Sequence, residues 1–307
     1  GIEGGGTMGD SNAVRCVAMT NGTALIGFTL SGGRTRGSAF TCPGGGVYSL
    51  STDTVISNCF ITGCRASTAT GAFGYGGGAY MGTLYACVLT NGSALYGGGA
   101  YGSVLHFCTV VKNNGGNGAG GLRVSSAYNC LIKGNTGGFI GGGGALDCTL
   151  QNCLIVGNSS AYGGGARYGN DSTIRHMYNC TVAGNTSSSA GGGIAPGPKY
   201  TNSVVVNSVI YSNTAPQGAN YAEGLDISYS CTFPATAGAG NRADPPLFVS
   251  GTGDYHLQPA SPCINAGTNG TWTADSLDFE GNRRVFGGTA DMGCYEYFFR
   301  GTLCVFW

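Results

Sequence analysis

Few side chains in this sequence could support catalysis. Hydrolysis of a glycosidic bond uses two carboxylates about 5–10 Å apart, and a lyase needs a base beside carboxylates that bind Ca²⁺. Residues 11–220 contain only three acids, Asp53, Asp147 and Asp171. The best cluster is Asp171 with Arg175 and His176, in a repeat of 27 residues that is longer than most. We expect a solvated loop there, and a catalytic site is the alternative.

Oxygen-bearing side chains also gather near the C-terminal end. They stand at nearly alternate positions, as in a loop that binds Ca²⁺, and are Asp275, Asp278, Glu280 and Asn282. The other interpretation is a turn whose Asp and Asn side chains accept backbone hydrogen bonds. In that case Arg283 or Arg284 would pair with Asp291 or Glu296. We favour the turn, so no cofactor is expected, and Ca²⁺ is the metal left open.

Cysteine is abundant, with 14 residues. Six of them recur at intervals of 21–28 residues, without the Cys-x-x-Cys pairs of a zinc site. If repeats stack about 4.8 Å apart, neighbouring thiols could form disulfides, but free cysteine is among the most buried residue types. We therefore favour a core column of free thiols: Cys59, Cys87, Cys108, Cys130, Cys153 and Cys180. Cys263 and Cys294 stand apart, and they are the candidate disulfide.

Tyrosines flank a repeated Gly-Gly-Gly-Ala motif. Stacked repeats would align them in two ladders, Tyr75, Tyr96 and Tyr162 before the motif and Tyr80, Tyr101 and Tyr168 after it. Exposed ladders would bind sugar rings or a neighbouring molecule, because tyrosine combines a large apolar face with a polar tip. Buried ladders would have only the structural role of closing each coil. Both interpretations stay open. His106 and His256 are isolated in the sequence, and we expect each to be a packed or surface residue.

The composition excludes several classes of protein. Glycine supplies 60 of 307 residues, and charged residues make up 9%, against about 25% in an ordinary soluble domain. Glycine costs a helix about 1 kcal/mol per position relative to alanine, so a helical fold is excluded. The net charge is zero and only three lysines occur, so no basic stripe is available for nucleic acid. No apolar run approaches the about 18 residues of a transmembrane segment.

Two alternating motifs predict the architecture. The first is Asn-Cys-x-x-x-Gly-Asn, as at residues 152–158, and the second is Gly-Gly-Gly-Ala, as at residues 163–166. Each unit holds short strands separated by Gly and Asn, which accept the positive φ of tight turns, and it is too short for a βαβ unit. We predict an all-β, right-handed parallel β-helix of about eight or nine coils over residues 1–235. An irregular C-terminal cap is predicted over residues 236–307.

Stacking turns each repeated position into a column. Residues two positions after the cysteines should share their inward face, and they are Ile61, Leu89, Val110, Ile132, Ile155 and Val182. Asparagines lie five positions after the cysteine position of the motif, which Ser208 occupies in the last copy, and they are Asn113, Asn135, Asn158, Asn185 and Asn213. We expect their amides to hydrogen-bond to one another along the axis, in a structural role.

The C-terminal motifs resemble a known family. Residues 254–267 read Asp-Tyr-His-Leu-Gln-Pro-Ala-Ser-Pro-Cys-Ile-Asn-Ala-Gly, and the later motifs are Leu-Asp-Phe-Glu-Gly-Asn-Arg-Arg at 277–284 and Asp-Met-Gly-Cys-Tyr-Glu-Tyr at 291–297. This pattern resembles bacterial surface or secreted β-helix proteins with a choice-of-anchor Q region. The coils are also similar, less closely, to the repeats of polymorphic outer-membrane adhesins. The resemblance implies an exported, envelope-associated β-helix, extracellular or on the cell surface, and no particular reaction.

Two segments depart from that pattern. Residues 1–6 look like the middle of a coil, so we expect that upstream coils and an export signal precede them. The C-terminal tail shows no anchor, and its aromatic residues are a candidate assembly element: Phe298, Phe299, Phe306 and Trp307.

The sequence favours a non-catalytic structural or adhesive protein. Residues 1–220 carry ten basic and five acidic groups, a net charge of +5, and residues 221–307 carry four and nine, a net charge of −5. Opposite charge at the two ends would favour head-to-tail assembly of copies into a filament. The alternatives are a carbohydrate-active enzyme, such as a polysaccharide lyase or glycoside hydrolase, and a glycan-binding module. The expected partner is therefore another copy of the chain or an extracellular glycan.

Overall fold

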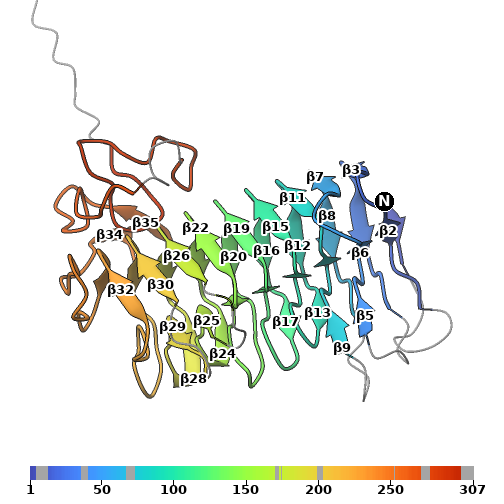
Figure 1. The fold of residues 1–307 in the computed structure, drawn as a ribbon, viewed down its shortest axis with the longest axis horizontal. Coiled ribbons are helices and arrows are strands. Elements are labelled where there is room, and N and C mark those ends of the chain that lie inside the picture. Colours follow the sequence, from blue (N-terminus) through green and yellow to red (C-terminus); the bar gives the residue numbers. More distant parts are fainter. Residues whose placement is uncertain are drawn as a thin grey trace, which may run out of the picture.

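The chain winds as a right-handed parallel β-helix, so the predicted fold class is confirmed (Figure 1). We describe it from a computed structural model, which covers residues 1–4, 13–35, 41–66, 73–169, 173, 175–198, 203–251, 253–270 and 277–298. Each coil contributes one short strand to each of three long parallel sheets. In chain order, a coil visits sheet II, then sheet III, then sheet I.

The strands of the three sheets follow one another along the axis. Sheet I contains β1 (Ile2–Glu3), β4 (Thr29–Ser31), β8 (Phe60–Thr62), β12 (Val88–Thr90), β16 (Thr109–Val111), β20 (Leu131–Lys133), β23 (Leu154–Val156), β27 (Thr181–Ala183), β31 (Val209–Tyr211) and β33 (Cys231–Thr232). Sheet II contains β2 (Val17–Met19), β6 (Val47–Ser49), β10 (Ala79–Tyr80), β14 (Ala100–Tyr101), β18 (Leu122–Arg123), β21 (Ala145–Leu146), β25 (Ala166–Tyr168) and β29 (Ile194–Pro196). Sheet III contains β3 (Ala24–Ile26), β7 (Val55–Ser57), β11 (Thr83–Tyr85), β15 (Val104–His106), β19 (Ser126–Tyr128), β22 (Thr149–Gln151), β26 (His176–Tyr178), β30 (Val204–Val206) and β32 (Asp226–Ser228).

Four shorter pairs complete the described strands. Three are parallel pairs in the turn between sheets I and II: β5 (Thr41–Pro43) with β9 (Phe73–Tyr75), β13 (Ser93–Ala94) with β17 (Asn114–Gly115), and β24 (Ser159–Tyr162) with β28 (Thr186–Ala190). The fourth is an antiparallel hairpin of β34 (Phe248–Ser250) and β35 (Asp254–Leu257).

The interior is a continuous hydrophobic core built by the central residue of each strand. In sheet I, Ile61 pairs with Leu89 and Leu89 with Val110, and all three are buried. The predicted inward column is thus confirmed, because a strand directs alternate side chains to one face. Small residues face it from sheet II, such as Ala79, Ala100, Ala145 and Ala166.

The predicted asparagine ladder is also confirmed. The Nδ2 of Asn135 donates to Oδ1 of Asn158 at 3.0 Å, and Nδ2 of Asn158 donates to Oδ1 of Asn185 at 2.9 Å. The backbone N–H of each Asn donates to the same acceptor oxygen at 2.9 Å. Buried amides need such partners, and here the next coil supplies them.

The middle glycine of the Gly-Gly-Gly-Ala motif is required by close approach of the coils. A Cβ on Gly143 would lie 2.2 Å from the carbonyl oxygen of Gly164 and 2.6 Å from that of Ser159. Such contacts are shorter than any real Cβ makes, so only glycine fits this turn.

The C-terminal segment lies along the side of the coils. Tyr255, Cys294 and Tyr295 pack on Leu154 and Val156, which face outward from sheet I. Cys263 and Met292 pack on Val209 nearer the end of the stack. In Figure 1 the orange-to-red chain accordingly runs beside the last coils.

Side chains at a corner of the coils fasten this segment. Asn129, Asn152 and Asn207 all have positive φ, of 54°, 51° and 51°. The Nδ2 of Asn152 donates to the Leu277 carbonyl at 2.7 Å, and the Nδ2 of Asn129 donates to the carbonyls of Leu277 and Asp278. Asparagine is among the few residues that accept this backbone conformation, so the same residue type serves the turn and the docking.

No helix in the described part of the chain could cross a membrane.

Candidate functional site

The most extensive outward arrangement of functional side chains is an aromatic face on the amino-terminal coils. We define the aromatic face as Phe73, Tyr75 and Tyr96 before the glycine turns and Tyr48, Tyr80 and Tyr101 after them. Tyr48, Tyr80 and Tyr101 occupy one column of sheet II, and Tyr75 and Tyr96 bridge in the adjacent turn. Phe73 is 42% exposed, and the five tyrosines are partly exposed.

Neighbouring rings of this face are stacked nearly parallel and displaced sideways. The ring centroids of Tyr48 and Tyr80 are 5.7 Å apart with planes 14° from parallel, and those of Tyr80 and Tyr101 are 5.7 Å apart at 7°. Carbon atoms in contact lie about 3.5–4.0 Å apart. Parallel rings in contact at 5.7 Å must therefore be displaced sideways, which leaves part of each face uncovered. Tyr75 joins the two columns, with its centroid 4.7 Å from that of Tyr101.

Arginines continue the aromatic face at both ends. The guanidinium carbon of Arg15 lies 4.7 Å from the ring centroid of Tyr48, and that of Arg123 lies 4.2 Å from Tyr96. Cations in these positions are attracted to the ring faces. Further along the axis, Arg167 lies over Tyr162 at 4.7 Å.

The predicted ladders need two corrections. Tyr168 is 1% exposed and packs in the core, so it does not belong with Tyr80 and Tyr101. One extra residue separates it from the Ala of its motif, and a shift of one residue turns a side chain to the opposite face of a strand. Arg167 takes the outward position instead. Tyr162 lies outside the stack of Tyr75 and Tyr96, because Gly118 and Gly141 stand in the intervening coils.

The repeated motif did not identify Tyr48, which follows Gly-Gly-Gly-Val. Its register with Tyr80 could have been read from the alignment of Val47 with Ala79. A further aromatic row was also not predicted. His106 stacks between Tyr85 and Tyr128 on the outer side of sheet III, at centroid distances of 4.9 and 5.0 Å, so it is a packed residue of a row.

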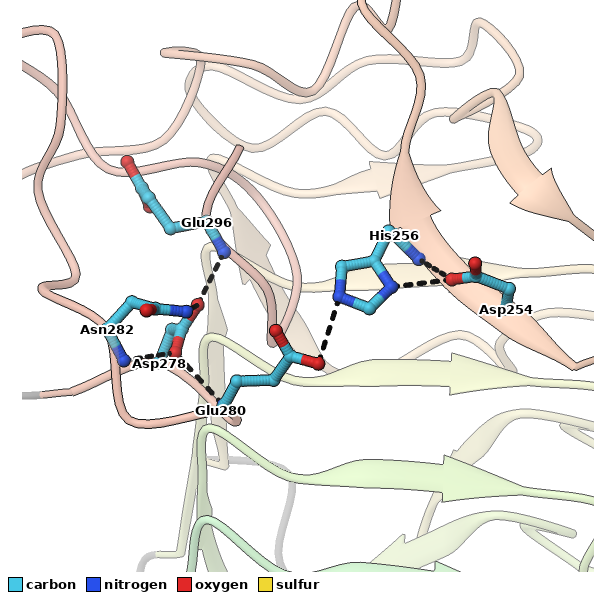
Figure 2. Close-up of polar contacts among 6 residues, drawn as sticks. All are labelled: Asp254, His256, Asp278, Glu280, Asn282 and Glu296. Carbon is cyan, nitrogen blue, oxygen red and sulfur yellow. Dashed lines mark hydrogen bonds and ion pairs between the residues drawn. The ribbon is translucent and has the colours of Figure 1, made fainter. Parts of the chain in front are cut away.

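His256 forms a second polar cluster, in the C-terminal segment (Figure 2). Its Nδ1 lies 2.5 Å from Oδ1 of Asp254, and its Nε2 lies 3.2 Å from Oε1 of Glu280. The ring also lies against Tyr295, with centroids 4.0 Å apart. The side chain was expected to be isolated, but it joins strand β35 to the loop that contains Glu280.

The electrostatics of this cluster favour a charged histidine. Burial opposes the charge of His256, but its hydrogen bonds to Asp254 and Glu280 outweigh it and raise the pKa of the imidazole. The same hydrogen bond lowers the pKa of Asp254. Both ring nitrogens are occupied, so this imidazole has no free position with which to take a proton from a substrate. The cluster therefore acts as a bridge between two parts of the segment.

The carboxylate of Asp278 organises a turn. Its Oδ1 accepts from the backbone N–H of Glu280 at 3.0 Å and of Asn282 at 2.8 Å, and its Oδ2 accepts from the N–H of Glu296 at 3.1 Å (Figure 2). These contacts match the turn interpretation. Asp275 lies outside the described residues. Within the described part of the chain, no group of three or more His, Cys, Asp or Glu residues could hold a metal.

A buried arginine in the same segment bonds backbone carbonyls, and it does not form the predicted ion pair with Asp291 or Glu296. Arg284 is 1% exposed, and its Nη2 donates to the carbonyls of Asp291 at 2.6 Å and Gly293 at 2.5 Å. Glu296 accepts from the N–H groups of Phe286 and Asp291. Burial and the nearby Asp291 raise the pKa of Glu296 to about 8, although Arg284 opposes the shift.

The candidate catalytic cluster of Asp171, Arg175 and His176 is only partly described. Asp171 lies outside the described residues. His176 is on β26, where its ring stacks on Tyr178 at 5.3 Å, and Arg175 directly precedes the strand.

The six repeated cysteines lie in the core, where each is at most 2% exposed. Their sulfurs accept backbone hydrogen bonds from the preceding coil, as from the N–H of Cys108 to Sγ of Cys130 at 3.3 Å. Ser208 takes this role after Cys180, at 3.2 Å. All 13 cysteines of the described chain are free.

The candidate disulfide is therefore wrong in this structure. Cys263 packs with Cys231, Leu257 and Met292, whereas Cys294 packs with Tyr255 and Tyr295 on earlier coils. The two thiols are thus parts of different clusters.

Of the aromatic tail, only Phe298 is described. Its ring lies against Phe286, with centroids 5.0 Å apart. Phe299, Phe306 and Trp307 fall outside the described residues.

Comparisons with known proteins return little. No family model matches the sequence, and no curated protein matches it. Among solved structures, the chain is similar to the crystal structure of pectate lyase Pel9A, with a TM-score of 0.48 and 14% identity. The match covers 96% of this chain and 85% of that one. A likeness at this level does not assign an activity to the chain.

Proposed function

We propose that this protein is a non-catalytic, glycan-binding β-helix and that its aromatic face contacts the sugar rings. The observation that carries the proposal is the parallel-displaced stack of five partly exposed tyrosines. Tyrosine presents an apolar surface to the C–H groups of a sugar and a hydroxyl to its polar groups. Because the coils fix the ring positions, little conformational entropy is lost on binding.

The polar groups beside the rings fit the same role. Asn117 lies next to Tyr96, and its Nδ2 donates to the tyrosine hydroxyl at 3.4 Å. A glycan hydroxyl could exchange with this partly exposed side-chain contact. A flat, repetitive surface of this kind suits an extended polymer better than a small molecule, which is usually held in a concave site.

The cellular setting that we propose is the exterior of a bacterium. Support comes from the resemblance of residues 254–297 to choice-of-anchor Q proteins. Adhesion and head-to-tail assembly into filaments stay predictions that rest on the charge difference between residues 1–220 and 221–307.

Affinity electrophoresis in gels containing a panel of polysaccharides tests the proposed function. We expect retardation by at least one polymer, and Tyr96→Ala or Tyr101→Ala should weaken the interaction about three- to tenfold through lost stacking. Tyr178→Ala is the matched control, because Tyr178 lies on sheet III, away from the aromatic face. Equal mobility of all variants on every polymer would exclude the proposal. Shortening of a polymer in the same incubations would instead favour a carbohydrate-active enzyme.

A further inference from the structure

We infer that the ligand of the aromatic face is an anionic glycan, whose acidic groups pair with the arginines at the ends of the tyrosine stack. This inference rests on the proposed glycan-binding function and names the class of polymer. It is carried by the positions of Arg15 and Arg123 and by the absence of described counter-charges around them.

The two arginines are built into the same surface as the tyrosines. In sheet II, Arg123 pairs with Tyr101 and so occupies the next position of the Tyr48, Tyr80 and Tyr101 column. Its guanidinium lies over Tyr96 of the adjacent column. Arg15 lies over Tyr48 at the other end. A polymer that follows the tyrosines would therefore meet a cation at each end of the stack.

Neither arginine is neutralised by the described protein. No ion pair within 4.0 Å joins Arg15 or Arg123 to a carboxylate of a described residue, and the ion pairs observed between described residues are those of His256 in the C-terminal segment. The Nε and Nη1 atoms of Arg123 are buried and make no hydrogen bond. Burial also lowers the pKa of Arg15. A charge-assisted hydrogen bond to an anion is especially favourable for a partly desolvated cation that has no other partner.

Carboxylate and sulfate groups fit this arrangement for two reasons. A guanidinium donates N–H···O bonds to an anion in its own plane, and stacking on tyrosine fixes that plane. In addition, residues 1–220 carry a net charge of +5, which attracts a polyanion over a distance set by the ionic strength. A neutral glycan would use the rings and leave the guanidinium groups unpaired.

The probes are alginate, alginate whose carboxyl groups have been reduced to alcohols, dextran sulfate and dextran. Affinity electrophoresis at low and high salt gives the apparent dissociation constant for each. We expect alginate to bind at least about tenfold more tightly than its reduced form, with the difference shrinking at high salt. Dextran sulfate set against dextran shows whether sulfate serves as well as carboxylate.

Variants of Arg123 separate the contribution of its positive charge from that of its planar, stacked guanidinium. Arg123→Gln should weaken alginate binding about tenfold and leave binding to the reduced polymer nearly unchanged. Arg123→Lys should fall between, because it keeps the charge but loses the stacked plane. Lys112→Gln is the control, since it removes one exposed cation on another side of the coils. Thermal unfolding followed by circular dichroism verifies that each variant is folded.

The outcomes distinguish the two proposals. Equal binding of alginate and its reduced form, with no effect of Arg123→Gln, would overturn the anionic class and leave glycan binding intact. Binding of none of the probes or of the wider polysaccharide panel would overturn both.

Discussion

Asn207 and Thr268 bind each other through a reciprocal pair of hydrogen bonds, although 61 residues separate them. The Oδ1 of Asn207 accepts from the backbone N–H of Thr268 at 2.8 Å, and its Nδ2 donates to the Thr268 carbonyl at 2.8 Å. A side-chain amide thus pairs with a peptide unit as a neighbouring strand would. This contact joins the C-terminal segment to a corner of the coils.

Asn207→Ala should therefore loosen the C-terminal segment. Two hydrogen bonds of about 1 kcal/mol each are lost, in addition to the cost of placing alanine at a positive φ. Asn58→Ala is the matched control, because Asn58 has the same φ of 51° and its amide bonds only Ser57. We expect Asn207→Ala to lower the free energy of unfolding by about 2 kcal/mol more than the control. Hydrogen exchange at residues 254–298 would locate the change, and equal effects of both substitutions would contradict the docking role.

The C-terminal segment should lose stability as the pH rises. Burial raises the pKa of Glu296 from 4.5 to about 8, so the folded segment binds this proton more tightly than the unfolded chain does. Stability then falls with rising pH across that window. The raised pKa of His256 acts in the same direction, because its bridge to Asp254 and Glu280 weakens when the imidazole becomes neutral.

Urea unfolding at pH 5.5 and pH 8.5 measures this dependence. Glu296→Gln should reduce the difference between the two midpoints, whereas Glu223→Gln, at an exposed carboxylate, should leave it unchanged. A wild-type midpoint that is higher at pH 8.5 would contradict the assigned sign.

Cys16 should be the most reactive of the described cysteines. It is only partly buried, and a hydrogen bond from the Cys64 thiol lowers its pKa to about 7, against the opposing effect of burial. The thiolate is the reactive form. Iodoacetamide at pH 7 followed by peptide mass spectrometry should therefore label Cys16 first. Cys64→Ala should slow that labelling about fivefold at pH 7. At pH 9.5 the same substitution should accelerate labelling about fivefold, because the Cys16 thiol is then mostly ionised in both proteins and the thiolate with the higher pKa is the stronger nucleophile. Preferential labelling of a core cysteine would refute the assignment.

Gly143→Ala should disrupt the coil turn. The added Cβ would overlap the Gly164 carbonyl oxygen, which belongs to the next coil and has no room to retreat. We expect a loss of about 3 kcal/mol in the free energy of unfolding. Gly253→Ala adds the same group where no atom lies within 4 Å, so its effect should stay within about 0.5 kcal/mol. Chemical denaturation of both variants provides the comparison.

The coils could be predicted from the sequence because their contacts repeat. Each core residue, such as Ile132, meets the equivalent residues of its two neighbours, Val110 and Ile155, so a period in the sequence becomes a column in space. Tyr168 shows the limit of this reasoning. One additional residue after the motif turned the ring inward, and the spacing to the preceding glycines was the only signal.

The docking of the C-terminal segment could not be predicted in the same way. Asn58 and Asn207 occupy the same place in the repeat, yet only Asn207 has a partner in the segment. Contacts over 61 residues have no periodic signal. The pairing of His256 with Asp254 could be partly predicted, because residues two apart on a strand share a face. The contact of His256 with Glu280 could not be predicted from the sequence.

The asparagine ladder gives the solenoid a polarity. From Asn113 to Asn213, each Nδ2 donates one hydrogen bond to the Oδ1 of the next asparagine in the ladder and one to a backbone carbonyl of the preceding coil. The series ends where Asn220 donates to the Phe233 carbonyl. Aligned hydrogen bonds polarise one another, so the inner members are held more strongly than the outer ones. Cys64 and Gly92 occupy the equivalent places in earlier coils and have no side-chain amide that could extend the series. The ladder therefore holds the middle coils together most firmly, and the coils that bear the aromatic face lie before its first member, Asn113.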